Sequence, residues 1–411
     1  MTHRTVVTGL GVVAPGGLGA EDHWKSTLRG ELLVGPISSF DASSYGVTLA
    51  GEVPDFPTGE YVPDQLRVQT DRWTHLALAA AELALTDAAY RPADHDPYDT
   101  AVILASGYGG VHFGQREIQS LWSRGRRAVS AYQSIAWFYA ASTGQVSIRH
   151  GAKGPSGVIV SDAAGGLDSI GSARRVLRRG TPTVLVGGTE APLCPYALAC
   201  QTTNGRMTTA TDPRDGYKPF DVRANGYAPG EGGALLLLED ADTAAARGAR
   251  SYGEVAGYAA THDAYRHDAP APDGKQYARA MTTALADAGL TPDDVDLVVA
   301  DGAGSPDLDR LEAEALHRVF GRRASRVPVT APQGFTGRLC SGGASLGVAT
   351  ALLALRDGIA PAVGNLDDPA PDLRLDLVCD QPRELDLGVV LVAARGHGGF
   401  NSALVLRKDL A

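Results

Sequence analysis

The stretch that decides the fold runs Val158-Ile159-Val160-Ser161-Asp162-Ala163-Ala164-Gly165-Gly166-Leu167-Asp168-Ser169-Ile170. A short β-branched run ends in small residues, and a helical pattern follows that has basic residues in its last turn and Gly180 after it. A side chain at such a strand-to-helix turn faces the helix N-terminus, where backbone amides lower the pKa of a thiol and bind an oxyanion. The apex residue is Ala163, which can use neither property. The segment has the strand-turn-helix pattern that carries a catalytic nucleophile in many enzymes, but its apex residue cannot act as a nucleophile. Taken alone, the segment also fits a buried turn whose small residues allow close packing.

Apolar β-rich runs and helical patterns alternate along the chain, which is the order expected of βαβ units on a largely parallel sheet. The charged, Ala-rich stretch 239–250 predicts a connector between two halves, residues 1–245 and 246–411, of one compact unit. The expected strands cover residues 6–8, 101–104, 158–160, 184–186, 234–238, 297–300, 389–392 and 403–406. The expected helices cover residues 73–88, 114–122, 166–179, 277–288, 309–319 and 346–356.

Size and composition exclude several classes of protein. The chain has 411 residues, 44% of them hydrophobic, and a formal net charge of −10, which argues against nucleic-acid binding. No apolar run approaches the roughly 20 residues of a membrane span, and a strand-like run stands where a leader would. The four cysteines contain no C-x-x-C pair and indicate reduced thiols, and the ten histidines lack ligand spacing for a metal. We therefore expect a soluble, cytoplasmic α/β protein without a bound metal.

The overall negative charge does not prevent local basic patches. Arginines near two of the expected helices could form a patch for an acidic carrier partner, or they could simply be solvated helix faces. These arginines are Arg116, Arg124, Arg126, Arg127, Arg174, Arg175, Arg178 and Arg179.

Four blocks together carry a family resemblance. Besides the turn at Ala163, they are Val7-Thr8-Gly9-Leu10-Gly11-Val12-Val13-Ala14-Pro15-Gly16, Lys218-Pro219-Phe220-Asp221 with Gly230-Glu231-Gly232-Gly233-Ala234, and Gly396-His397-Gly398-Gly399-Phe400-Asn401. In this order they resemble β-ketoacyl synthases over nearly the whole chain, and the family's catalytic Cys then falls on Ala163. The resemblance implies a thiolase-like α/β fold, with two duplicated βαβ halves in an αβαβα layered arrangement, although no internal repeat is readable.

The resemblance also locates the other catalytic positions of that family. Its condensation reaction uses a thiolate, two histidines that polarise the thioester carbonyl and assist decarboxylation, and a supporting lysine. The first His falls on Asp301, the Lys on Gln333 and the second His on Arg338. Substitution of one catalytic residue could reflect drift or specialisation. Substitution of all four, while the surrounding glycines are kept, implies that the protein keeps the fold but does not catalyse the condensation.

A further stretch narrows the resemblance. Residues 131–140 and 143–149 resemble chain length factors, the inactive β subunits of type II polyketide synthases. This implies an obligate heterodimer or higher assembly with a catalytic ketosynthase α subunit, which extends malonyl units on an acyl carrier protein. The phosphopantetheine arm arrives on that carrier, so no cofactor of the chain's own is expected. The resemblance places the subunit interface at Tyr132, Gln133, Trp137, Phe138 and Tyr139.

Chain length factors set product length through a tunnel at the subunit seam, and the resemblance places the gate on Val111, Gly114 and Ile118, with His112 and Phe113 beside them. Spacings of three and four put the three gate positions on one helical face. Bulky gates would stop elongation by steric overlap, so these small and aliphatic residues predict a long tunnel unless a neighbour such as Phe113 or Trp122 fills the space. Ordinary helix packing is the alternative.

The apex residue bears on the starter unit. Many chain length factors carry Gln there, an amide linked in the family to starter formation by malonyl decarboxylation. Ala163 offers neither donor nor acceptor, which makes a starter-forming role doubtful and points to a divergent branch, such as one that makes reduced polyenes in place of aromatic products.

Two enzyme alternatives stay open from the sequence. Ser345 in Gly343-Ala344-Ser345-Leu346-Gly347 satisfies the G-x-S-x-G pattern of serine hydrolases, with Asp367, Asp376 and His397 following in order, but a polar, Gly-rich run precedes it where a buried strand is needed. A decarboxylase or acyltransferase could instead use Ser161 or Cys340 as its nucleophile, with Arg338 lowering the thiol's pKa.

Overall fold

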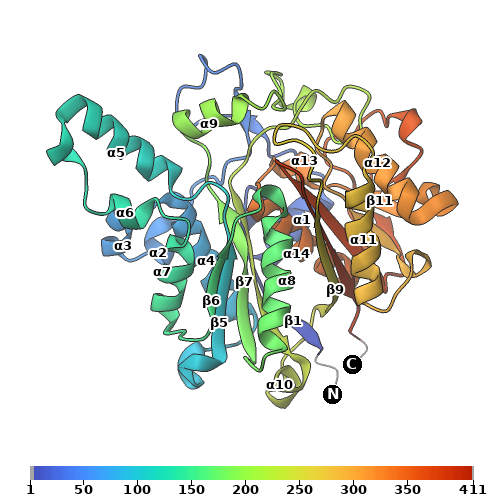
Figure 1. Ribbon diagram of the computed structural model, residues 1–411, viewed down its shortest axis with the longest axis horizontal. Coiled ribbons are helices and arrows are strands. Elements are labelled where there is room, and N and C mark those ends of the chain that lie inside the picture. Colours follow the sequence, from blue (N-terminus) through green and yellow to red (C-terminus); the bar gives the residue numbers. More distant parts are fainter. Residues whose placement is uncertain (1–3, 410–411) are drawn as a thin grey trace.

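Two matching sets of strands form the core of the protein, whose computed structural model describes residues 4–409. The first set is β1 (Thr5–Ala14), β5 (Thr100–Ala105), β6 (Ser156–Ile159), β7 (Thr183–Glu190) and β8 (Gly232–Asp240). The second set is β9 (Gly253–His262), β10 (Leu297–Val299), β11 (Pro328–Thr330), β15 (Val389–Gly396) and β16 (Phe400–Arg407). In each set the strands lie in the spatial order third, second, fourth, fifth, first, and the sets join where β1 pairs with β9 (Figure 1). The repeated order confirms the predicted fold of two duplicated halves.

Helices complete the αβαβα layers (Figure 1). Helices α8 (Gly165–Leu177) and α14 (Ser341–Asp357) pack on each other between the two sets of strands. On the outer face of the first set lie α4 (Arg72–Asp87) and α7 (Ala141–His150). On the outer face of the second lies α11 (Lys275–Asp287), with α12 (Pro306–Phe320) beside it. Helix α14 is apolar on nearly every side, as its place between two sheets requires.

The duplication is visible in one close contact that each half repeats. A Cβ added to Gly9 of β1 would overlap the carbonyl oxygen of Ala84 in α4. A Cβ added to Gly257 of β9 would overlap the carbonyl oxygen of Ala284 in α11. Each half therefore needs glycine where its first strand crosses its first long helix. Because only such contact positions require a particular residue type, the two halves can share a fold without recognisable sequence identity to each other.

The strand directions differ from the sequence prediction. Pairs β5–β6, β5–β7, β10–β11 and β10–β15 are parallel, but β7–β8, β1–β8, β15–β16 and β9–β16 are antiparallel. The prediction of a largely parallel sheet is therefore wrong. Only three residues, 397–399, connect β15 to β16, and a parallel connection needs a crossover of a dozen or more. The expected strands and helices are otherwise present. Of the ten core strands the sequence analysis missed β9 and β11, and among the helices that cover them it missed α7.

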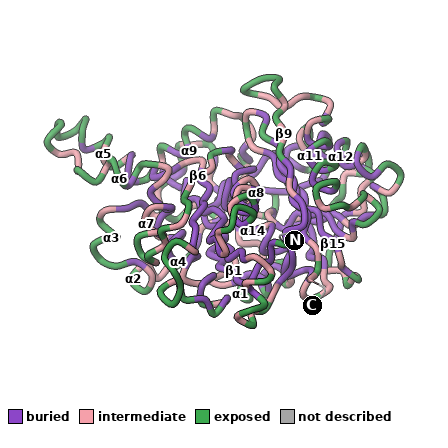
Figure 2. Tube along the Cα trace, turned by 60° about the horizontal axis from the view of Figure 1, so that its bottom comes forward, coloured by how far each residue is buried: buried purple, intermediate pink, exposed green. Residues whose placement is uncertain are grey.

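A projecting arm is the other feature that positions the site. It comprises residues 111–139, with α5 (Val111–Arg124) and α6 (Gln133–Ala136), and it stands away from the body with mostly exposed residues (Figures 1 and 2). No helix within residues 4–409 is long and apolar enough to cross a membrane. The remaining helices and short strands are β2 (Gly17–Leu18), α1 (Ala20–Leu28), β3 (Gly35–Pro36), β4 (Leu49–Ala50), α2 (Thr58–Tyr61), α3 (Asp64–Gln69), α9 (Pro195–Thr202), α10 (Ala241–Ala246), α13 (Gln333–Thr336), β12 (Ile359–Ala360), β13 (Asp376–Leu377) and β14 (Arg383–Glu384).

Candidate functional site

The turn at Ala163 has the strand-to-helix build that the sequence predicts. Strand β6 ends at Ile159, a short 3-10 turn covers Asp162–Ala164, and α8 begins at Gly165. Asp162 has a positive φ of 50°, a strained conformation for a residue with a side chain, and its carboxylate accepts a hydrogen bond from the His397 amide at 2.7 Å. The methyl group of Ala163 is buried at the apex. The turn is thus retained without a group that could attack a substrate.

Close packing also explains part of this segment. A Cβ on Gly166 would lie 2.5 Å from the carbonyl oxygen of Ser341 and 2.6 Å from Oγ of Ser345. Glycine therefore lets α8 approach α14 across the central layer.

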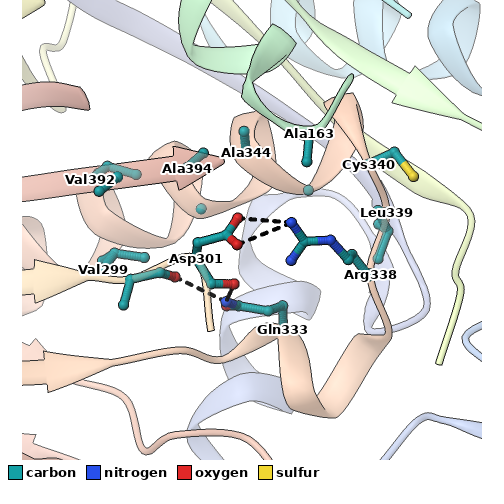
Figure 3. Close-up of a pocket in the computed structure, with 14 residues that line it drawn as sticks. Ala163, Val299, Asp301, Gln333, Arg338, Leu339, Cys340, Ala344, Val392 and Ala394 are labelled. Carbon is teal, nitrogen blue, oxygen red and sulfur yellow. Dashed lines mark hydrogen bonds and ion pairs between the residues drawn. The ribbon is translucent and has the colours of Figure 1, made fainter. Parts of the chain in front are cut away.

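The structure brings together the four residues that the resemblance places at the family's catalytic positions (Figure 3). Ala163, Asp301, Gln333 and Arg338 line one cavity of about 40 Å³ at the N-terminal end of α14. A space of that size holds about two or three water molecules. The rest of its lining is Val299, Ala300, Leu339, Cys340, Gly343, Ala344, Gly347, Val392, Ala393 and Ala394.

Asp301 and Arg338, on which the resemblance places the two histidines, form a buried ion pair. Nη2 of Arg338 lies 3.0 Å from both carboxylate oxygens of Asp301, and the two side chains are almost wholly buried (Figure 3). The same nitrogen donates to the carbonyl oxygen of Arg395 at 3.0 Å, while the Arg395 amide donates to Asp301 at 3.2 Å. Burial acts to lower the pKa of Arg338, but the charge on Asp301 and its neighbours outweighs this and holds that pKa well above its ordinary value. The guanidinium cannot serve as a general base.

Gln333, on which the resemblance places the lysine, carries a neutral amide. Its Nε2 donates to the carbonyl oxygens of Ala300, at 2.9 Å, and of Asp301. These bonds tie α13 to the end of β10, so the side chain has a structural partner on the backbone and supplies no positive charge to the cavity.

The sequence analysis did not identify Glu312, whose carboxylate binds the backbone at Asp301. Its carboxylate accepts hydrogen bonds from the amides of Asp301 and Gly302, each at 2.8 Å, and from the hydroxyl of Tyr277 at 2.9 Å. Burial, followed by the nearby Asp301, raises the pKa of Glu312. The signal available in the sequence for this residue was a carboxylate on the inner face of the helical pattern that follows Asp301. Glu312 fixes the backbone from which the Asp301 side chain reaches Arg338.

The hypothesis of Cys340 or Ser161 as nucleophile fails on electrostatics and geometry. Burial, together with Asp162 and Glu190, raises the pKa of the Cys340 thiol well above its ordinary value, and Arg338 does not compensate. A thiol in that state stays protonated and unreactive. The hydroxyl of Ser161 donates to Asp168, whose carboxylate also accepts from the hydroxyls of Tyr258 and Ser402.

The serine hydrolase hypothesis fails as well. Ser345 is fully buried in the second turn of α14, with no strand before it. Of its three candidate partners, Asp367 pairs with Lys218, Asp376 pairs with Arg383, and His397 is exposed. The G-x-S-x-G match reflects small residues needed for helix packing.

A larger pocket leads from the surface to the ion pair. It has a volume of about 630 Å³ and shares Asp301, Arg338 and Cys340 with the small cavity. The loop at His397 and the Tyr108 side chain also line it. A ligand that enters this pocket therefore meets the Asp301–Arg338 pair at its inner end. No group of three or more His, Cys, Asp or Glu that could hold a metal lies together within the described part of the chain.

Glu190, which lies beside Cys340, gives the folded protein a pH dependence. Its carboxylate accepts from the hydroxyls of Ser341, at 2.8 Å, and Ser106, at 3.2 Å, and burial raises its pKa to about 7. The folded state keeps a proton that the unfolded chain releases above about pH 4.5, so this stabilisation is complete below pH 4.5 and is lost as the pH rises through 7. The change amounts to about 3 kcal/mol.

We expect Glu190→Gln to remove that dependence. Urea unfolding at pH 5 and pH 8 should show the free energy of unfolding of the wild type falling relative to that of the variant. Parallel pH profiles for the two proteins would show that Glu190 does not hold the proton.

The expected gate residues lie at the start of the arm. Val111, Phe113 and Gly114 are buried, whereas His112 and Ile118 are exposed because α5 leaves the body after its first turn. The room expected at Gly114 is already filled. A Cβ there would lie 2.9 Å from Cδ1 of Trp137, so the indole of this chain occupies the space.

The expected interface residues form an exposed apolar face of the arm. Trp137 is 48% exposed and Phe138 58%, with Tyr132 also exposed and Gln133 and Tyr139 half-buried. An exposed apolar area of this kind is typical of a protein–protein contact. Four further side chains of the arm extend it: Ile118, Leu121, Trp122 and Ile135.

Comparisons with known proteins agree with this geometry. Family models of the β-ketoacyl synthase N-terminal and C-terminal domains match residues 2–244 and 252–367. The β subunit of the tetracenomycin polyketide synthase ketoacyl synthase from Streptomyces glaucescens is 54% identical over 98% of each chain. The solved structure of the ishigamide ketosynthase/chain length factor matches at TM-score 0.91 and 28% identity over 99% of both chains. A type II polyketide synthase acyl-carrier protein complex with its hexaketide-bound ketosynthase matches at TM-score 0.90 and 26% identity over the full length of both chains.

The chain therefore belongs to the β-ketoacyl synthase family, within the group of polyketide synthase β subunits known as chain length factors.

Proposed function

We propose that this chain is the non-condensing partner of a catalytic ketosynthase α subunit, and that the pair extends malonyl units on an acyl carrier protein to a polyketide of set length. The observation that carries the proposal is the composition of the cavity lined by Ala163, Asp301, Gln333 and Arg338, where the turn carries a methyl group and Asp301 and Arg338 pair with each other. A related β subunit and a related ketosynthase/chain length factor structure support the same role.

Two surfaces support the pairing. The exposed apolar face of the arm needs a cover, and β6 is an edge strand with unpaired backbone groups on its outer side. Together they favour an obligate interface of roughly 2,000 Å² or more.

The carrier protein would bring the phosphopantetheine arm, so this chain would hold no cofactor of its own. A type II polyketide synthase carrier is bound to its ketosynthase in one of the related structures. The eight arginines considered for carrier docking do not form one patch, since Arg174 is buried against Asp287 and Arg116 lies over the Phe113 ring. The exposed group at the end of α5, Arg124, Arg126 and Arg127, is the better candidate for an acidic carrier surface. Four cysteines without disulfides support a reducing, cytoplasmic location.

The pairing is tested by mixing the chain with a catalytic ketosynthase α subunit and separating the species by size exclusion. We expect a stable 1:1 complex that forms polyketide from malonyl-loaded carrier protein, and no product from the chain alone. Failure to form the complex, or condensation by the chain alone, would refute the proposed function.

Restoring only the thiol should not restore the reaction. We expect Ala163→Cys, assayed without the α subunit, to remain at least ~10⁴-fold slower in condensation than a catalytic subunit, because general acid–base groups contribute about 10²–10⁴ and oxyanion donors about 10²–10³. The matched variant carries Ala163→Cys with Asp301→His, Gln333→Lys and Arg338→His. Condensation by the single variant would show that the ion pair does not block the site.

A further inference from the structure

One buried carboxylate caps two helices that lie far apart in the sequence. Asp71 is the N-cap residue of α4, where its Oδ1 accepts from the Trp73 amide at 3.2 Å. Its Oδ2 accepts from the Phe113 amide at 2.6 Å, in the first turn of α5. The side chain is buried, so both bonds are shielded from water. Asp71 therefore joins a helix of the body to the helix that begins the arm.

Helix α5 depends on this distant carboxylate because its own start offers no cap. It begins after Gly110, which has no side chain to accept from the free amides of the first turn. A carboxylate at the N-terminus of a helix satisfies such amides and interacts favourably with the helix dipole. Burial raises the pKa of Asp71 to about 6, although the amides that it binds and the charge on Arg116 act in the opposite direction. The side chain is therefore mainly ionised at neutral pH, and its bond to α5 is charge-assisted.

The position of the arm depends on the first turn of α5, because the helix leaves the body there (Figure 1). Val111, Phe113 and Gly114 are buried, and most of the helix beyond them is exposed. The helix has 14 residues and is about 21 Å long, so a rotation of about 10° at its start would move its far end by roughly 4 Å. A shift of that size would take the apolar face of the arm out of register with a closely packed partner surface.

Two further contacts hold the same turn. The Arg116 guanidinium lies 4.7 Å from the centre of the Phe113 ring, and Oε1 of Gln115 accepts from the Tyr196 amide at 2.7 Å. The first contact is internal to α5, and the second runs through a flexible side chain. The bond to Asp71 ties the backbone of α5 to α4, which packs on β1 and β8. It therefore refers the direction of the arm to the core of the first half.

We infer that Asp71 is a positioning residue, whose cap on two helices fixes the direction in which the arm projects, so that the arm's apolar face is preformed for the catalytic subunit. This inference rests on the proposed function. A preformed surface binds more tightly than a mobile one, because less conformational freedom is lost on association. Loss of the bond to Phe113 weakens pairing although every apolar side chain of the arm is kept.

The experiment compares Asp71→Ser with Asp296→Ser in the full-length protein. A serine hydroxyl caps a helix about as well as aspartate does, so Asp71→Ser keeps a cap for α4 but is too short to serve α5 as well. Asp296 is the matched control, because its carboxylate also accepts from two backbone amides, those of Gly388 at 2.8 Å and Val389 at 2.9 Å, but in the second half of the chain.

Two measurements follow the loss of the bond. Hydrogen–deuterium exchange in the first turn of α5 should become about tenfold or more faster in Asp71→Ser, because a hydrogen bond to a charged group contributes a factor of about 10 to 100. Exchange in α4 should stay as in the wild type. The dissociation constant for a catalytic α subunit, measured by calorimetry, should rise about tenfold or more in Asp71→Ser. Asp296→Ser should pair as the wild type does.

The outcomes separate this inference from the proposed function. If the wild type does not pair with the catalytic subunit, the proposed function fails, together with the inference that rests on it. If the wild type pairs and Asp71→Ser pairs equally well, the positioning role of Asp71 is overturned while the proposed function stands. Faster exchange throughout the chain, or an equal loss of pairing in Asp296→Ser, would assign the effect to general destabilisation and would likewise overturn it. Should Asp71→Ser fail to fold, the same two measurements on Asp71→Asn decide the question, because that amide keeps the volume of the side chain and one acceptor oxygen.

Discussion

Arg338→Ala should destabilise the folded protein by about 3–5 kcal/mol, because it leaves the buried carboxylate of Asp301 without its counter-charge. The remaining partner of that carboxylate is the Arg395 amide at 3.2 Å, which cannot neutralise it. Asp301→Ala should cost a similar amount, since the Arg338 guanidinium would then be buried beside a backbone oxygen, Tyr217 and Tyr227 but without a counter-charge. The measurement is the free energy of unfolding in urea, with the unfolding slope checked for each variant.

A double-mutant cycle tests the pair itself. The variant with both side chains truncated should lose less stability than the sum of the two single variants, by about 1–3 kcal/mol of coupling. Arg214→Ala is the matched control, because Arg214 also pairs with an aspartate, Asp212, but on the exposed surface. It should cause no measurable loss. Additive losses, or an Arg338→Ala protein as stable as the wild type, would show that the two side chains do not stabilise the fold through their pairing.

The sequence predicts the fold class well because local patterns are enough for it. The run at 158–170 alternates strand, turn and helix, and four motif blocks in order identify the layered architecture. Strand direction was predicted wrongly because it depends on where each connection returns. The three residues between β15 and β16 force an antiparallel hairpin, and hydrophobic runs do not reveal this.

The site shows the same limit at the level of side chains. Motif spacing identified Asp301, Gln333 and Arg338 as altered positions, and the structure places them in one cavity with Ala163. Their interactions were not predictable, because Asp301 and Arg338 are 37 positions apart and meet only through tertiary packing. The gate positions were assigned to one face of α5 because residue spacing predicts which side chains share a helical face. The side chain that packs on this face at Gly114 is Trp137, from a later segment, and residue spacing does not predict such contacts.

Phe138→Asp should break the complex with the catalytic subunit. Phe138 is 58% exposed in the middle of the arm's apolar face, so in the complex its side chain would become buried. A charge placed there would be desolvated without a partner, and aromatic residues at the centre of an interface commonly contribute ~2 kcal/mol or more. We expect the dissociation constant to rise about 30-fold or more, since each 1.4 kcal/mol is a factor of ten. The fold of the isolated variant should be unchanged, because the side chain is already open to water.

The matched control for that variant is Tyr98→Asp, which places the same charge on an aromatic residue that is 68% exposed and lies outside the arm. It should pair with the catalytic subunit as the wild type does. Size exclusion and a titration by calorimetry measure the pairing, and polyketide yield should fall together with it. If Phe138→Asp pairs normally while the wild-type complex is stable, the arm is not the interface, and the subunit seam must then be sought at another surface, beginning with the open edge of β6.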